Sequence, residues 1–366
     1  MIREKWAYRH HTSAIRSLIG TENYTTRRIP VPPVGVHPTA RQLQFFTTAQ
    51  LGALARQIAR TRADVVRCRS YVATHLALLV RQKFALSFKI VFDARSMMPE
   101  EGVLTGRWGA YSSDFAFWKA REAQMAAQAD LTLSVSEPMR QNFAKIGARH
   151  SALSYLNVPL KTPDDSAVSD ISRLDAGTPV MAYAGYLADG SWHVPANLWQ
   201  VFASFQSHIP RAKLLVITKS SHSALTRSLA QSQFSHLQSC VSLTSANSPT
   251  EVVQLLAGAD LSVLSYRTPE NEFETEMSLA TFATKTAEYL SVGLPVAVNR
   301  YCGGAASYAV GHDAGVAYDP YEGLTAAQAN TLMRQARERP RISAAAQKDF
   351  NVDENTDRFV QLLKDL

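Results

Sequence analysis

Short apolar runs alternate with longer amphipathic segments along most of this chain. That alternation is typical of βα units and predicts parallel sheets. In the first half we expect strands at 63–68, 89–92, 131–134 and 152–155, and helices at 72–83, 113–128 and 137–146. Ser136 stands just before the last of these helices and is followed by Glu137, an order that favours a helix start.

The alternation of apolar runs and amphipathic segments is interrupted at 161–178 and resumes after it. Residues 161–178 are polar with little apolar periodicity, which is typical of a linker. After the linker we expect strands at 179–185, at 212–218, near Val241, at 260–265 and at 295–298, and a helix at 195–208. Beyond Tyr318 the chain is expected to be helical to its end, most clearly at 326–338 and 354–366.

The length of 366 residues is too great for one ordinary core, so two domains are predicted. Their expected bounds are 1–160 for the first domain, 161–178 for the linker, 179–345 for the second domain, and 346–366 for a C-terminal helix that packs back on the first. The first domain looks abbreviated, because Met1–Trp6 does not read as an opening buried strand. A short helix from Thr12 or Ser13 to Leu18 and an edge strand at Arg27–Val31 are expected instead.

Composition narrows the functional class. A hydrophobic content of 46% and a charged content of 19% are those of a folded protein, and no apolar run is long enough to cross a membrane. Three well-separated cysteines form no metal-ligand spacing. The net charge of +7 favours an anionic partner, such as a phosphorylated substrate or an anionic membrane surface. No dense basic run with interleaved aromatic residues occurs, so nucleic acid is not expected.

The most informative segment runs from Thr284 to Val298 and reads as a helix, a glycine stop and a buried strand. Lys285 and Glu288 lie three residues apart in the first turn of that helix and share one face. A helix N-terminus offers unpaired N–H groups and partial positive charge, which suit a phosphate. Lys285 adds a full charge, and Glu288 can accept hydrogen bonds from sugar hydroxyls. The alternative is a solvated surface pair.

Ligands of parallel sheets bind beyond the carboxyl ends of the strands, so the residues that follow each strand are candidates. Asp93 and Arg95 follow one strand, where they could orient a sugar hydroxyl or hold a phosphate; a structural ion pair is the alternative. Gly185 allows close backbone approach. Lys219 is suited to a phosphate, and Tyr266 to stacking on a base or to ordinary packing.

Several enzyme classes lack their motifs here. No Gly-x-Gly-x-x-Gly follows a strand, which disfavours a nicotinamide enzyme, and no P-loop or Gly-x-Ser-x-Gly elbow is present. We therefore expect no cofactor.

The segments at 182–185, at 259–261 and above all at 285–296 resemble the nucleotide-binding domain of GT-B fold glycosyltransferases, in the group that contains the family-4 retaining enzymes. The segments at 92–95, 99–101, 129–131 and 135–137 are similar to the acceptor domain of bacterial polysaccharide glycosyltransferases. The resemblance implies that Glu288 holds the nucleotide ribose and that Lys285 lies beside the donor phosphates. Two departures stand out: Ala280 occupies the place of a second glutamate, and the loop from Gly185 to Trp192 lacks a basic pair.

We therefore expect an α/β protein of two Rossmann-like parallel-sheet domains facing across a cleft. The resemblance implies a metal-independent hexosyltransferase that moves a sugar from a nucleotide diphosphate sugar to a glycan or lipid-linked acceptor. It would be cytoplasmic, peripheral on the inner face of the membrane. The expected donor-site residues are Gly185, Lys219, Tyr266, Thr284, Lys285 and Glu288, and the expected catalytic residues are Asp93 and Arg95. A sugar-nucleotide epimerase and a non-catalytic subunit of the same fold remain the alternatives.

Overall fold

The computed structural model describes residues 35, 37–155 and 177–366. The segments expected at 1–6, 12–18 and 27–31, and most of the expected linker, lie outside this range. Two compact units are present. Of the described residues, the smaller unit contains 35, 37–63 and Leu79–Ser87, and the larger unit contains Asp64–Leu78, 88–155 and 177–366.

The smaller unit contains the helices α2 (Ala40–Leu43) and α3 (Thr48–Thr61) and the end of α4 (Tyr71–Lys83). Each of the first two helices begins with a capping box, in which a threonine and a glutamine satisfy each other's backbone N–H groups. α3 buries Leu51, Ala55 and Ile58, which recur at helical spacing on one face. The Lys83 ammonium donates a hydrogen bond of 2.9 Å to the Thr48 hydroxyl.

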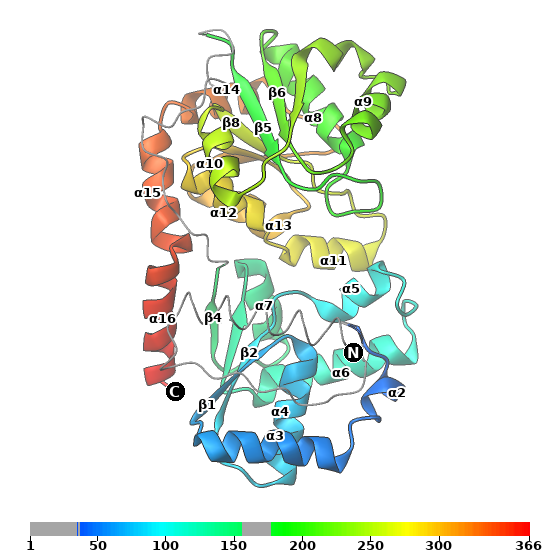
Figure 1. Ribbon diagram of the computed structural model, residues 1–366, viewed down its shortest axis with the longest axis vertical. Helices are drawn as coiled ribbons and strands as arrows, with labels where there is room; N and C mark the ends of the chain where they lie inside the picture. The colour runs from blue at the N-terminus through cyan, green and yellow to red at the C-terminus, as the bar shows by residue number, and fades with distance from the viewer. Residues whose placement is uncertain (1–34, 36, 156–176) are drawn as a thin grey trace. The chain divides into compact units, whose positions relative to one another are not determined.

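The larger unit contains two parallel sheets (Figure 1). The first sheet has the strand order β1-β2-β3-β4, with β1 at Val65–Arg69, β2 at Lys89–Asp93, β3 at Leu131–Ser134 and β4 at Ser151–Leu153. The helices that accompany it are α5 (Met98–Leu104), α6 (Ser113–Gln128) and α7 (Glu137–Lys145). As predicted, Ser136 caps α7: its hydroxyl accepts a hydrogen bond from the Met139 N–H at 3.2 Å.

The second sheet has the strand order β10-β9-β8-β5-β6-β7. Its strands are β5 (Val180–Ala184), β6 (Lys213–Ile217), β7 (Val241–Thr244), β8 (Leu261–Leu264), β9 (Val296–Asn299) and β10 (Gly315–Tyr318). The order reverses at β5, which is the switch of a doubly wound sheet. Ala184 pairs with Ile217, and Ile217 pairs with Thr244, so the chain leaves β5, β6 and β7 at one common edge.

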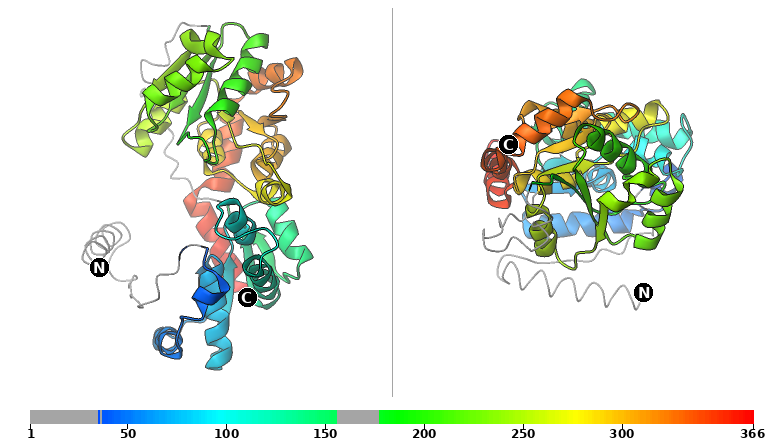
Figure 2. Two further views of the ribbon diagram at one scale, coloured as in Figure 1. Left: turned by 90° about the vertical axis from the view of Figure 1, so that its right-hand side faces the viewer. Right: turned by 90° about the horizontal axis from the view of Figure 1, so that it is seen from above.

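Helices cover both faces of the second sheet (Figure 2). They are α8 (Pro195–His208), α9 (His222–Gln231), the 3₁₀ helix η3 (Ser235–Cys240), α10 (Pro249–Ala257), α11 (Glu272–Ala280), α12 (Thr284–Ser291), α13 (Gly303–Gly311) and α14 (Ala326–Gln335). Trp199, Phe202 and Phe205 of α8 are fully buried against β5, β6 and β8. Burial of each such aromatic side chain contributes about 2–3 kcal/mol to folding stability, so α8 anchors one face of the second sheet.

The chain ends with α15 (Arg339–Phe350) and α16 (Val352–Lys364). Phe359, Leu362, Leu363 and Leu366 of this end pack against β2 and β3 of the first sheet. The Arg67 guanidinium of β1 lies 4.5 Å from the centre of the Phe359 ring. The last helix therefore lies against the first sheet, although the helices before it belong to the second.

The predicted βα alternation, including the glycine stop after α12, agrees with the structure except at one strand. Gly293 has φ +80°, and a Cβ there would lie 2.6 Å from the Arg339 carbonyl oxygen, so glycine is required. The sixth strand, β10, was not expected. Its four residues, Gly-Val-Ala-Tyr, form a short run that opens with glycine, and they make an edge strand paired only to β9 among the described strands. No helix among the described residues has the length and apolarity of a bilayer-spanning segment.

Candidate functional site

The N-terminus of α12 is the centre of the site. Ala283 holds the N-cap position, and its side chain makes no capping hydrogen bond. The first N–H groups of a helix have no partner within the helix, so this end can receive an anion. Lys285 lies in the first turn, as the sequence predicted, whereas Glu288 is the fifth residue of α12 and lies just beyond that turn. Both side chains are half-buried.

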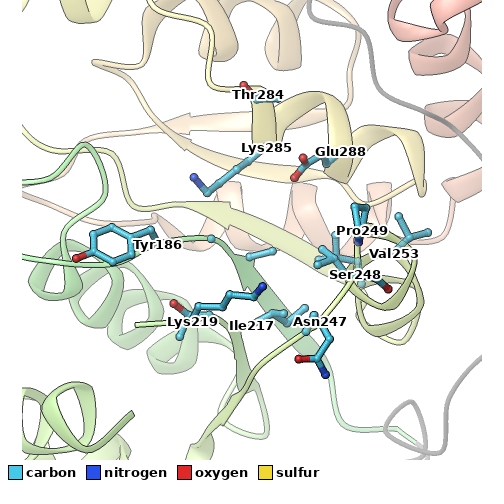
Figure 3. Close-up of a pocket in the computed structure, with 16 residues that line it drawn as sticks. Tyr186, Ile217, Lys219, Asn247, Ser248, Pro249, Val253, Thr284, Lys285 and Glu288 are labelled. Carbon is cyan, nitrogen blue, oxygen red and sulfur yellow. The ribbon is translucent and has the colours of Figure 1, made fainter. Parts of the chain in front are cut away.

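A cavity of about 650 Å³ opens beside this helix end (Figure 3). Of the predicted donor-site residues, the structure brings five together in its lining: Gly185, Lys219, Thr284, Lys285 and Glu288. Lys285 and Lys219 approach the cavity from opposite sides, one from α12 and one from the loop after β6. We call this the first pocket.

The loop after β5 fits closely around the lysine. Gly185 has φ +139°, a conformation that L-residues rarely adopt. A Cβ on Gly185 would lie 1.9 Å from Cε and 2.7 Å from Nζ of Lys285. Lys285 Nζ also lies 5.9 Å from the centre of the Tyr183 ring, within the range of a cation–π contact. Glycine is therefore what lets the ammonium group cross the end of β5.

Burial sets the electrostatics of the first pocket. It lowers the pKa of the Lys285 ammonium, an effect that the Glu288 charge opposes. It also raises the pKa of the Glu288 carboxyl, which the Lys285 charge opposes. Each charged side chain is thus held at a desolvation cost that a bound ligand can offset.

A second pocket of about 290 Å³ shares Thr284 and Lys285 with the first. Tyr266 lies here and not in the lining of the first pocket. Its side chain is only 2% exposed, and its ring stacks on Trp192 with centres 5.7 Å apart and an angle of 16°. Tyr266 therefore packs against Trp192 at the second pocket, away from the lining of the first, and its stacking on a base stays a prediction.

Asp93 and Arg95, the predicted catalytic pair, are in contact. Arg95 Nε lies 2.7 Å from Asp93 Oδ1, and Arg67 on the neighbouring strand donates two hydrogen bonds to Oδ2, at 2.8 and 3.1 Å. Asp93 is 1% exposed, whereas Arg95, with φ +66°, lines the second pocket. With both carboxylate oxygens engaged, Asp93 is suited to positioning Arg95 more than to contacting a substrate, so its catalytic role stays a prediction.

A second buried charge cluster lies on α5 and α6. The Lys119 ammonium contacts Glu100 at 2.8 Å and Glu122 at 2.5 Å, and the Tyr71 hydroxyl donates to Glu122 at 2.5 Å. Burial, then the Glu122 charge, raises the pKa of Glu100 to about 7. The sequence analysis noted Glu100 only as part of the segment 99–101 and did not predict this cluster, because the proximity of these residues depends on how α5 packs against α6.

Other lining residues were also missed. Asn247, Ser248 and Pro249 close one side of the first pocket. They follow β7. The sequence analysis placed that strand only near Val241, without an end, so the residues beyond its carboxyl end were not considered as candidates. Within the described ranges, no three metal-ligating side chains gather at one place.

The first half of the chain matches a known family. Residues 8–155 match the sequence model of Glycosyltransferase Family 4. The match spans less than half of the chain, and it coincides with the region in which the sequence resembles the acceptor domain of such enzymes. No curated protein matches the chain in sequence.

Solved structures show the fold of the whole chain. A sucrose-phosphate synthase from Thermosynechococcus elongatus superposes with a TM-score of 0.62 at 15% identity, covering 95% of this chain and 86% of that one. Anabaena HepE in complex with UDP gives 0.62 at 15% identity, covering 90% and 85%. A trehalose 6-phosphate synthase from Burkholderia multivorans gives 0.56 at 13% identity, covering 89% and 75%.

These findings confirm the predicted GT-B fold of two parallel-sheet domains and the resemblance to family-4 glycosyltransferases. They support the predicted glycosyltransferase function, and they give no support to the epimerase alternative.

Proposed function

We propose that this glycosyltransferase transfers a hexose from a nucleotide diphosphate sugar to a hydroxyl of a glycan or lipid-linked acceptor. One observation carries the proposal: Lys285, Glu288 and the uncapped start of α12 line one cavity together with Gly185 and Lys219. The Anabaena HepE structures, which hold UDP or UDP-glucose in the same fold, support a nucleotide-sugar donor.

In this proposal the first pocket takes the nucleotide. The diphosphate lies at the start of α12, where Lys285 and the backbone N–H groups stabilise the charge that develops as the sugar leaves. Lys219 faces it from the opposite side, and the Glu288 carboxylate accepts hydrogen bonds from the ribose hydroxyls. These cations and the helix end do the electrostatic work without a metal ion. A transfer assay with and without a chelating agent tests this last point, and we expect equal rates.

The sugar and the acceptor occupy the second pocket, which borders Lys285. Bond formation joins the acceptor oxygen to the anomeric carbon, the bond from that carbon to the phosphate oxygen breaks, and the proton of the acceptor hydroxyl leaves with the nucleoside diphosphate. Arg95 lines this pocket and is suited to contacting the sugar or the acceptor, and Asp93 holds its guanidinium in place. Asp93 is thus proposed as a positioning residue for the same reaction.

The distribution of charge supports a peripheral association with an anionic membrane. The described residues of the smaller unit include six Lys or Arg and no Asp or Glu, although the whole chain has a net charge of only +7. Arg56, Arg60 and Lys83 are exposed on it, together with Phe45. Such residues attract anionic lipid at about 1 kcal/mol each.

Cosedimentation with phosphatidylglycerol vesicles tests the association. Changing Arg56, Arg60 and Lys83 to Gln should weaken binding about a hundredfold. The matched control changes three exposed arginines of the larger unit, Arg211, Arg227 and Arg337, to Gln. Equal losses in the two triple variants would contradict a specific membrane face.

A thermal-shift screen of UDP, GDP, ADP and CMP sugars tests the donor. A ligand at 100 times its Kd stabilises the fold by about 2.7 kcal/mol, which is readily measured. Glu288→Ala should reduce the shift, whereas Glu276→Ala, at an exposed position on α11, should not. Sugar transfer to a lipid-linked acceptor then separates an enzyme from a subunit that only binds. No shift with any nucleotide sugar would refute the proposal.

A further inference from the structure

The loop after β5 lacks Arg and Lys but ends in two aromatic residues, Trp192 and His193. Its backbone is held against the loop after β8: the Arg267 N–H donates to the Trp192 carbonyl at 2.8 Å, and the Val194 N–H donates to the Ser265 carbonyl at 3.1 Å. His193 and Tyr266 form an isolated antiparallel bridge. These contacts fix both aromatic side chains at the second pocket, which they line together.

The ring of Trp192 is held in place by packing on its neighbours. Tyr266 stacks behind it, and Tyr266 in turn receives the edge of the His193 ring at 5.7 Å and 88°. Trp192 itself is half-buried and contributes to the lining of the second pocket. An aromatic face carries partial negative charge and attracts weakly positive C–H groups, such as those on one face of a pyranose ring.

His193 complements this face with a polar group. It is 6% exposed, and burial followed by the nearby Lys285 charge lowers its pKa to about 3, so the ring is neutral at physiological pH. Its Nδ1 is enclosed and has no hydrogen-bond partner among the described residues. A buried N–H without a partner is rarer than an unsatisfied acceptor, so the proton belongs on Nε2. The nitrogen left for a ligand is thus an uncharged donor.

We propose that Trp192 and His193 form a sugar subsite in the second pocket. Trp192 packs on the apolar face of a neutral hexose ring, and His193 Nε2–H donates a hydrogen bond to one of its oxygens. Because Lys285 borders both pockets, a sugar attached to a diphosphate in the first pocket reaches this wall directly. The inference rests on the proposed function and deepens it, since it assigns recognition of the sugar to two uncharged side chains, Trp192 and His193.

Titration calorimetry with two ligand pairs, UDP with UDP-glucose and GDP with GDP-mannose, tests the subsite. For the pair that binds, Trp192→Ala and His193→Phe should each weaken the nucleotide sugar about tenfold and leave the nucleoside diphosphate unchanged. His193→Gln keeps an amide donor and should retain most of the sugar affinity. Asp189→Ala, an exposed position in the same loop, is the control and should change neither ligand.

The outcomes separate the two claims. If the wild-type protein binds a pair but Trp192→Ala and His193→Phe leave sugar affinity intact, or weaken both members of the pair equally, the subsite is wrong and the proposed function stands. If neither pair binds to the wild-type protein, both claims fail for these nucleotides. Circular dichroism of each variant shows that the fold is intact before its affinities are compared.

Discussion

The close fit of Gly185 around Lys285 leads to a sharp prediction. Gly185→Ala places a methyl group where the lysine chain now passes, 1.9 Å from Cε. The position of the new Cβ is fixed by the backbone, so the flexible Lys285 side chain must move away from the end of β5. The variant should therefore disturb nucleotide binding through a side chain that the mutation does not itself change.

Two contributions set the size of the effect. An alanine at φ +139° lies in a region that is almost exclusive to glycine and costs about 1–3 kcal/mol of folding stability. Displacing Lys285 removes a charge-assisted hydrogen bond to the phosphate, worth about 1.5–3 kcal/mol. Since about 1.4 kcal/mol corresponds to a factor of ten, Kd for the nucleotide should rise about ten- to a hundredfold.

A matched variant separates strain from displacement. Gly190 lies in the same loop at φ +74°, and a Cβ there would meet no atom within 4 Å. Gly190→Ala should cost about 1–2 kcal/mol of stability and leave Kd unchanged. The assays are urea unfolding for stability and titration calorimetry, with whichever nucleotide stabilises the wild-type protein, for affinity.

A double-mutant cycle provides the decisive comparison. In a Lys285→Ala background the clash is gone, so Gly185→Ala should produce no further loss of affinity. The reasoning is refuted if the folded Gly185→Ala protein binds nucleotide as tightly as the wild type. It is also refuted if the variant loses the same affinity whether or not Lys285 is present.

Three further predictions concern buried charges. Burial raises the pKa of Glu288, so its ionised form destabilises the unliganded fold; Glu288→Gln should raise Tm at pH 7, with a gain that shrinks toward pH 4, while weakening nucleotide binding. The pKa of Glu100, about 7 in the fold and near 4.3 when unfolded, means that stability is lost as pH rises through 7; Glu100→Gln should flatten the dependence of urea midpoints measured between pH 5.5 and 8. Asp93→Asn leaves Arg67 and Arg95 without their carboxylate and should lower stability by about 2 kcal/mol in urea unfolding, less than for a fully buried pair because Arg67 is partly exposed; an unchanged midpoint would contradict the structural part of its role.

The sequence predicted what depends on neighbours along the chain. The start of α12 could be located because its lysine, glutamate and glycine stop lie within ten residues of one another. Most strands could be found because parallel sheets buried on both faces read as apolar runs. β10 was missed because it is a run of only four residues that opens with glycine, which is too short to stand out as a strand.

Contacts between separate segments escaped sequence reasoning. Asp93 and Arg95 were expected to act together, but Arg67 joins them only because β1 lies beside β2, with Arg69 opposite Asp93. Tyr266 was expected near the base because it follows a strand. Its position depends on how Trp192 and His193 fold against it, which no local pattern encodes.

The shared border of the two cavities has a kinetic consequence. Lys285 lines both pockets, so in the proposed reaction its charge stays paired with the nucleoside diphosphate until that product leaves. The by-product should therefore compete with fresh donor, and its departure should gate each turnover.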